Sequence, residues 1–163
     1  MKKLLFQTTL FLLLCSCIGK IEKTPVDYVN NRIGNISHLL VPTYPTTHLP
    51  NSMLRMIPTH NEFTTDRMEG LALNSPSHRQ GHSLLLLPYR GDVKDFGGNL
   101  IYRYDHEKST PYSYSVYLDD FSVGVDFAPA AKSAIYRFRF EDSDRRLILL
   151  KANGKGEIDI KDG

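Results

Sequence analysis

Apolar and polar residues alternate in short runs through the second half of the chain. Residues 122–128 place valine or phenylalanine at every second position, and residues 132–140 do the same with alanine, tyrosine and phenylalanine. Because successive side chains of a strand point to opposite faces, this alternation predicts half-buried strands. Further short strands are predicted at 53–57, 71–73, 83–87, 100–105, 112–118 and 146–151, and at 157–160 after a turn over Gly154-Lys155-Gly156.

These strands recur about every ten residues and are separated by turn residues, and the runs are rich in tyrosine, phenylalanine and valine. Such spacing and composition are typical of an all-β fold, an antiparallel β-sandwich. Residues 26–82 differ from this pattern, because proline, asparagine, threonine, serine and histidine dominate there. We expect long ordered loops in this part, and loops of this kind often carry function.

Length and charge narrow the class of protein. The 163 residues suit one ordinary domain, and 41% hydrophobic with 23% charged residues is typical of a globular protein. The formal charge of +2 comes from Lys2 and Lys3, and without them 18 basic side chains balance 18 acidic ones. A neutral chain does not have the basic surface of a nucleic-acid binder, so we expect no nucleic-acid partner.

The first residues have the pattern of an export signal. Lys2-Lys3 precedes an apolar stretch from Leu4 to Leu14, which is too short to span a bilayer comfortably. Leu14-Cys15-Ser16-Cys17 resembles a bacterial lipobox, so we predict a signal peptide over 1–16, lipidation of Cys17 and a tether over 17–25. The alternative is a plain secretory signal with incidental cysteines. The prediction places the chain in the bacterial cell envelope, anchored to the membrane through lipid, in an outer membrane facing the periplasm or the surface.

This arrangement leaves no cysteine pair for a disulfide in the mature chain, because Cys15 leaves with the signal and Cys17 is acylated. The remaining residues, 26–163, are predicted to form the β-sandwich domain. Lys161-Asp162-Gly163 follows the alternation of Ile158 and Ile160, and Asp-Gly after such a run is a hairpin signal. We therefore expect the domain to be truncated at its C-terminal end.

Two segments carry a resemblance to a known family. Asp27-Tyr28-Val29-Asn30 leads to Ile33-Gly34, and a proline-rich passage follows before the apolar run at 53–57. Further on, the segment 102–121 contains His106-Glu107-Lys108, then Pro111-Tyr112, then Tyr117-Leu118-Asp119. Over about residues 26–150, the chain resembles the N-terminal part of glycoside hydrolase family 92, the calcium-dependent exo-α-mannosidases.

The resemblance implies a β-sandwich packed against a larger, C-terminal helical catalytic domain. It also implies inverting hydrolysis of terminal α-mannosides of glycans, which needs a general acid and a general base with a water between them. In the family, both carboxylates and most contacts to calcium come from the helical domain. We therefore expect no catalytic residue and no metal ligand in this chain, calcium only in the full-length enzyme, and no activity of this piece alone.

Four loop residues are the candidates for one wall of the sugar pocket, where the resemblance places it: Tyr44, His48, His78 and Arg79. Their side chains can form hydrogen bonds with sugar hydroxyls. His78 and His82 have the i, i+4 spacing of zinc ligands on a helix, but the surrounding Pro76 and Gly81 disfavour a helix. Asp119-Asp120 is interpreted as a turn rather than a catalytic pair.

Two other functions stay open on the sequence. Tyrosines at 102, 104, 112, 114 and 117 could form a sugar-stacking platform of a stand-alone carbohydrate-binding lipoprotein, although alternate tyrosines in a sandwich usually pack in the core. A structural envelope lipoprotein without a ligand is the other alternative.

Overall fold

The computed structural model describes residues 22–35, 39, 43–59, 66–75, 81–141, 145–153 and 159. These residues form nine β-strands and three single-turn 3-10 helices. The strands are β1 (Ile57–Thr59), β2 (Arg67–Met68), β3 (Gly70–Ala72), β4 (Leu84–Arg90), β5 (Tyr102–Ser109), β6 (Tyr114–Leu118), β7 (Val123–Pro129), β8 (Ala134–Phe140) and β9 (Arg146–Ala152). The 3-10 turns are η1 (Pro25–Tyr28), η2 (Val93–Asp95) and η3 (Asp119–Phe121).

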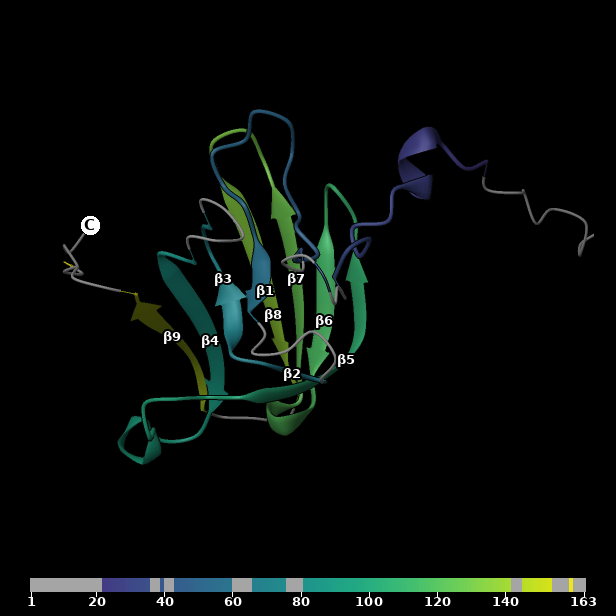
Figure 1. The fold of residues 1–163 in the computed structure, drawn as a ribbon. Helices are drawn as coiled ribbons and strands as arrows, with labels where there is room; N and C mark the ends of the chain where they lie inside the picture. Colours follow the sequence, from purple (N-terminus) through teal and green to yellow (C-terminus); the bar gives the residue numbers. More distant parts are fainter. Residues whose placement is uncertain are drawn as a thin grey trace, which may run out of the picture.

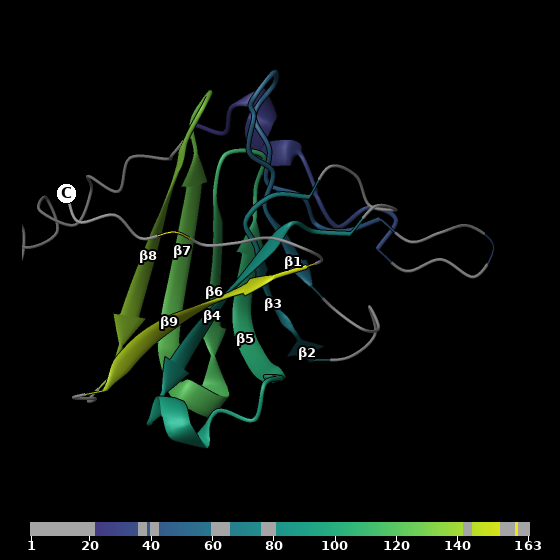
Figure 2. The ribbon, with the colours of Figure 1, turned by 90° about the vertical axis from the view of Figure 1, so that its left-hand side faces the viewer.

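The strands form two antiparallel sheets. One sheet has the order β1-β3-β4-β9 and the other has the order β2-β5-β6-β7-β8. In Figure 1, β9 and β4 lie to the left of β6 and β5, and Figure 2, seen from that side, shows β4 and β9 crossing the strands of the larger sheet obliquely. The predicted all-β, antiparallel sandwich is therefore confirmed.

The alternation in the sequence corresponds to the core. Val123, Val125 and Phe127 of β7 are buried, and each lies opposite an aromatic residue of β8 in the strand register. The alternate aromatics of β8 are partly buried against the same core, with the rings of Phe127 and Tyr136 4.8 Å apart. Among the described residues, a hydrophobic cluster with members from both sheets forms the core, and its burial stabilises the fold.

The tyrosines of β5 and β6 divide between core and surface. Tyr102 and Tyr114 are among the largest fully buried side chains, whereas Tyr112, in the turn between the strands, is exposed. Tyr104 and Tyr117 are half-buried. The interpretation of alternate tyrosines as core residues is confirmed for Tyr102 and Tyr114, so these side chains do not form one continuous stacking platform.

Two strand boundaries differ from the predictions. We expected a strand over 53–57 ending before Pro58, and a strand over 83–87 ending at Pro88. In the structure, β1 contains Pro58 and β4 continues through Pro88 to Arg90. Pro88 pairs with Ile148 of β9, whereas β3 pairs only with Leu85 and Leu86. A proline is tolerated there because its missing N–H faces a side of β4 that no strand of the described residues occupies.

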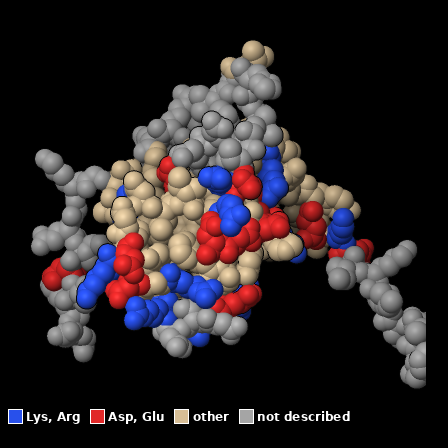
Figure 3. All heavy atoms as spheres, turned by 90° about the horizontal axis from the view of Figure 1, so that it is seen from below, with Lys and Arg blue, Asp and Glu red and all other residues tan. Residues whose placement is uncertain are grey.

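The surface carries charges of both signs. Arg103 forms an ion pair with Asp120 at 2.9 Å, and Arg137 and Arg139 both pair with Asp126. On the face seen in Figure 3, acidic and basic side chains lie next to one another rather than in one large basic area. In the part of the chain that the structure describes, no helix is long and apolar enough to cross a membrane.

Candidate functional site

The loop that carries two of the predicted sugar contacts forms a lobe over residues 43–56, at the top of the molecule in Figure 1. Its ends are joined by a pair of backbone hydrogen bonds between Thr47 and Met56, at 3.1 and 3.2 Å. Thr47 is buried, and its hydroxyl contacts the carbonyls of Thr110 and Ser113 in the turn between β5 and β6. The base of the 43–56 lobe is therefore fixed to the larger sheet.

The tip of the lobe is fixed as well. The Ser52 hydroxyl donates to the carbonyl of Ala130 at 2.9 Å, and the Met53 amide donates to the carbonyl of Ala131 at 2.9 Å. Ala130 and Ala131 belong to the turn between β7 and β8. The lobe is thus held at both ends by turns at the same end of the sheet, which restricts the side chains that it presents.

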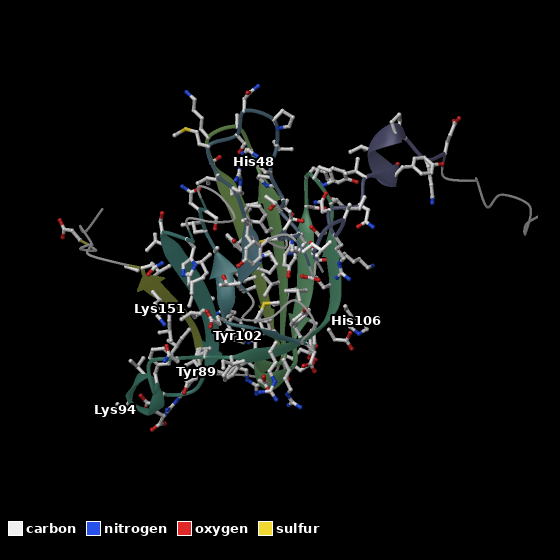
Figure 4. The ribbon with its side chains drawn as sticks, in the orientation of Figure 1. His48, Tyr89, Lys94, Tyr102, His106 and Lys151 are labelled. Carbon is white, nitrogen blue, oxygen red and sulfur yellow. The ribbon has the colours of Figure 1, made fainter. Side chains whose placement is uncertain are left out.

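His48 lies in the 43–56 lobe at the top of Figure 4, and its ring takes part in the fold of the loop. Its Nε2 lies 2.9 Å from the carbonyl oxygen of Ser52. Because a carbonyl can only accept, Nε2 carries a proton in this contact, and when the ring holds that proton alone Nδ1 is an acceptor. A half-buried, oriented imidazole of this kind can accept a hydrogen bond from a sugar hydroxyl.

The other predicted contacts are placed only in part. Tyr44 is half-buried in the lobe, and its carbonyl accepts from the Thr46 hydroxyl at 3.2 Å. His78 and Arg79 lie outside the described residues, as does the predicted lipidation site Cys17. The structure thus brings Tyr44 and His48 onto one loop and leaves the contribution of His78 and Arg79 a prediction.

A β-bulge in β5 creates a feature that the sequence reasoning did not predict. The register with β6 shifts between Asp105 and Lys108, and His106 adopts a left-handed backbone with φ of 53°. The extra residue turns Glu107 toward the face of the sheet that holds Tyr114. The Glu107 side chain is only 7% exposed, and it accepts a hydrogen bond from the Tyr114 hydroxyl at 2.8 Å.

Arg32 and Asn31 join this carboxylate to the 43–56 lobe. Arg32 forms an ion pair with Glu107 and also donates to its backbone carbonyl at 3.2 Å. The neighbouring Asn31 amide donates to the carbonyl of Thr46 at 2.9 Å and to the Ser109 hydroxyl at 3.2 Å. We name Asn31, Arg32, Glu107 and Tyr114 the Glu107 cluster. It connects the N-terminal segment, the lobe and β5 in one network.

The electrostatics of this cluster keep the Tyr114 phenol neutral beside the Glu107 carboxyl group. Burial raises the pKa of Tyr114 well above its usual value, and the nearby Glu107 charge raises it further. Burial followed by Glu107 also raises the pKa of Tyr104, against the opposing effect of Arg32. Both phenols therefore stay protonated, and the Tyr114 hydroxyl acts as a donor to Glu107, which suits a structural network. The sequence contained one signal for it, the His106-Glu107-Lys108 segment, but not its partners.

The acidic pair singled out from the sequence, Asp119-Asp120, takes part in a turn and an ion pair. Asp120 lies in η3 and accepts from the Arg103 backbone at 2.7 Å and from its guanidinium at 2.9 Å. Burial is the largest single influence and raises the pKa of Asp120, but the hydrogen bonds and the charge of Arg103 together lower the pKa overall, so the carboxylate is ionised and structural. The turn interpretation of Asp119-Asp120 is confirmed.

His82 is placed, whereas His78 is outside the described residues. Burial lowers the pKa of His82, with Glu69 opposing and Lys151 adding to this shift, so the ring is neutral at pH 7. Among the described residues, no group of three or more histidine, cysteine, aspartate or glutamate side chains is arranged to hold a metal ion.

Comparisons with known proteins agree with this architecture. The model of the glycosyl hydrolase family 92 N-terminal domain matches residues 28–162. No match was found among curated proteins. Among solved structures, the family GH92 α-mannosidase BT3965 from Bacteroides thetaiotaomicron is similar, with a TM-score of 0.69 and 21% identity over 81% of this chain and 20% of that chain.

Two further structures give the same result. BT3965 in complex with mannoimidazole has a TM-score of 0.65 and 22% identity over 78% of this chain and 20% of that chain. The inverting mannosidase BT2199 from B. thetaiotaomicron VPI-5482 has a TM-score of 0.64 and 22% identity over 79% of this chain and 20% of that chain. The present chain thus spans about a fifth of the length of these enzymes. At this identity the structures show a shared fold, and with the match over residues 28–162 the chain belongs to glycosyl hydrolase family 92, as its N-terminal domain.

Proposed function

We propose that this chain is the N-terminal part of a secreted, lipid-anchored glycoside hydrolase that removes terminal α-mannosyl residues from glycans by an inverting mechanism. The observation that supports this proposal best is the family match over residues 28–162. Two of the similar structures are α-mannosidase BT3965, one of them with mannoimidazole, and the third is the inverting mannosidase BT2199. The proposal assigns both catalytic carboxylates and the calcium contacts to a helical domain beyond this chain.

In this proposal the 43–56 lobe is one wall of the sugar site. Sugar recognition needs donors and acceptors held in fixed positions, since each misplaced hydrogen bond loses binding energy. The lobe meets this requirement because Thr47, Ser52 and Met53 fix it to two turns of the larger sheet. Tyr44 and His48 supply the hydroxyl and imidazole of this wall, and we assign His78 and Arg79 to the same wall.

The first experiment is to measure the mass of the native gene product in the membrane fraction of its own cells, with an antibody against residues 83–160. We expect a species several times heavier than 18.6 kDa. That species should release mannose from α-mannosides, and chelation of calcium should abolish the release. A lipidated product of about 18 kDa or less would contradict the enzyme proposal and favour a stand-alone glycan-binding lipoprotein.

The wall residues are tested in the same native-length enzyme. Changing Tyr44, His48, His78 and Arg79 together to alanine should lower kcat/KM for α-mannosides by at least tenfold, or about 1.4 kcal/mol of transition-state stabilisation. The control changes Lys94 and Asp95 to alanine, because both are exposed polar residues of η2, and Lys94 lies at the opposite end of the molecule from His48 in Figure 4. Unchanged kcat/KM in the quadruple variant would disprove this assignment.

Replacing the two cysteines of the chain one at a time tests lipidation separately. Metabolic labelling with a fatty acid should mark the wild-type product and the Cys15→Ser variant, and it should fail with Cys17→Ser. Equal labelling of both variants, or no labelling of the wild type, would contradict a lipid anchor at Cys17.

A further inference from the structure

The Glu107 carboxylate is a fixed point of the larger sheet. One of its oxygens, Oε1, accepts from the hydroxyl of the fully buried Tyr114 at 2.8 Å, and the other, Oε2, pairs with Arg32. The Glu107 side chain is only 7% exposed, whereas the Arg32 side chain is 49% exposed. An exposed arginine has many rotamers to lose, so Arg32 is the partner whose position depends on this contact.

Arg32 in turn fixes the N-terminal segment, residues 22–35, against β5. Its guanidinium also donates to the backbone carbonyl of Glu107 at 3.2 Å, so two contacts hold it there. The neighbouring Asn31 amide donates to the Ser109 hydroxyl at 3.2 Å and to the carbonyl of Thr46, in the 43–56 lobe, at 2.9 Å. Figure 1 shows this segment, in purple, running from η1 toward β5 and β6. It therefore joins the end of β5 to the lobe.

The stretch of the lobe that carries Tyr44 is bound to the N-terminal segment at both ends. Before Tyr44, the Thr43 amide donates to the Gly34 carbonyl at 2.8 Å. After Tyr44, the Thr46 carbonyl accepts from Asn31, and the Thr46 hydroxyl donates to the Tyr44 carbonyl at 3.2 Å. The position of Tyr44 therefore follows the position of the N-terminal segment.

His48, the other placed residue of the proposed wall, is held differently. It lies inside the loop that the backbone bonds between Thr47 and Met56 close, and its Nε2 contacts the Ser52 carbonyl at 2.9 Å. The Thr47 hydroxyl binds the turn between β5 and β6. These contacts come from the lobe and the sheet. A shift of the N-terminal segment should therefore displace Tyr44 and leave His48 in place.

We propose that Glu107 is a positioning residue of the sugar site, which holds Tyr44 in place through Arg32 and Asn31. This inference rests on the proposed function, in which Tyr44 and His48 belong to one wall of that site. Glu107 is nearly buried and each of its oxygens already accepts a hydrogen bond, so it acts through Arg32 and not on the sugar itself. A displacement of about 1 Å in a positioning group can cost on the order of 100-fold in rate.

Glu107→Gln in the native-length enzyme separates positioning from folding. The amide oxygen can still accept from the Tyr114 hydroxyl, but the amide nitrogen cannot accept from Arg32. We expect kcat/KM for α-mannosides to fall by roughly tenfold or more, while the midpoint of urea denaturation stays close to that of the parent. Lys108→Ala changes the exposed neighbouring side chain and should alter neither quantity. Unchanged kcat/KM in Glu107→Gln would overturn the proposal.

Two double variants show whether the loss depends on Tyr44. In a Tyr44→Phe background the hydroxyl that Glu107 positions is absent, so Glu107→Gln should have little further effect on kcat/KM. In a His48→Ala background, Glu107→Gln should lower kcat/KM by the same factor as in the parent. Equal factors in the two backgrounds would overturn the proposal, because the loss would then not depend on Tyr44.

Hydrogen exchange of the same native-length protein gives a readout that needs no activity. The Thr43 amide, which donates to Gly34, should exchange about tenfold faster in Glu107→Gln than in the parent, whereas the Met56 amide, which donates to Thr47, should not change. A protein that releases mannose but shows neither this change nor the kinetic loss would overturn only the positioning by Glu107. Faster Thr43 exchange in a protein without mannosidase activity would overturn the proposed function and leave Glu107 as the residue that positions the lobe.

Discussion

The Tyr102 hydroxyl donates a hydrogen bond of 3.1 Å to the backbone carbonyl of Pro88. Tyr102 lies at the start of β5 in the larger sheet and Pro88 lies inside β4, so this bond joins the two sheets through the core. A proline has no N–H, and the carbonyl of a strand residue points to the same side as its nitrogen. The bond therefore satisfies the one polar group that Pro88 presents where β4 has no neighbouring strand.

Removing this hydroxyl should destabilise the domain without disturbing its packing. Tyr102 is fully buried, so Tyr102→Phe leaves the Pro88 carbonyl without its partner in the core. We expect the free energy of unfolding to fall by about 1–3 kcal/mol, measured by urea denaturation. Tyr112→Phe is the control, because its side chain is 44% exposed in a turn. Equal stability of the two variants would show that the inter-sheet bond contributes nothing.

The buried phenols predict a loss of stability at alkaline pH. Burial raises the pKa of Tyr102, Tyr114 and Tyr136 above the ordinary value of 10.0. The unfolded chain therefore releases these protons at lower pH than the folded chain. Stability from each phenol is complete below pH 10 and decreases as the pH rises above it, by up to about 1.4 kcal/mol per pH unit for each group.

Phenolate absorbance and circular dichroism, followed together during an alkaline titration, check this prediction. Ionisation of the three tyrosines should coincide with the loss of β-structure, and Tyr136→Phe should reduce the dependence of stability on pH by one proton. Ionisation of all tyrosines before any unfolding would contradict it.

Alternation predicted the strands of the second half because β7 and β8 each bury one face. Val123, Val125 and Phe127 lie on the buried side as the period of two requires. The predicted strand ends at Pro58 and Pro88 were wrong, because β1 and β4 continue through these prolines. Whether a proline ends a strand depends on which side of that strand has a neighbour. That information is in the sheet order, not in the local sequence.

Less of the candidate site than of the fold could be predicted from the sequence. Tyr44 and His48 could be proposed because the family resemblance places a sugar-binding loop there. The Glu107 cluster depends on a bulge at His106, which shifts the register of β5 by one residue and turns Glu107 to the opposite face. No periodicity predicts such a shift, since it depends on a left-handed backbone at His106, a residue type that seldom adopts this conformation. Its partner Arg32 lies 75 residues away from Glu107 in the sequence, and only the fold brings the two together.

Gly34 should not tolerate a side chain. Its φ is +85°, and a Cβ atom there would lie 2.9 Å from the Thr43 hydroxyl oxygen, which donates to the Ile33 carbonyl at 3.0 Å. Gly98 has a similar φ of +89° with no atom within 4 Å of its Cβ position. We expect Gly98→Ala to lower the free energy of unfolding by about 1 kcal/mol through backbone strain alone. Gly34→Ala should have a larger effect, because the Thr43 contact adds to the strain.

Urea denaturation of both glycine variants measures the difference. The excess for Gly34→Ala over Gly98→Ala reports the contact with Thr43, at the start of the 43–56 lobe. If the two variants lose the same stability, the Ile33-Gly34 turn is set by backbone conformation alone and not by its packing on the lobe.

The Glu107 cluster should behave as one coupled unit. The Glu107 carboxylate is nearly buried and binds both the Tyr114 hydroxyl and Arg32. Glu107→Ala leaves the fully buried Tyr114 hydroxyl without its acceptor, so we expect a loss of about 2–3 kcal/mol in the free energy of unfolding. Lys108→Ala is the matched control, because its exposed neighbouring side chain lies outside the cluster.

A double-mutant cycle separates the hydrogen bond from the rest of the network. Once Glu107→Ala has removed the acceptor, Tyr114→Phe should cost less than it does in the parent, or even restore stability, because the unpaired buried hydroxyl is gone. We expect a coupling free energy of about 1 kcal/mol or more from urea denaturation. Strictly additive losses would show that the carboxylate and the phenol act independently.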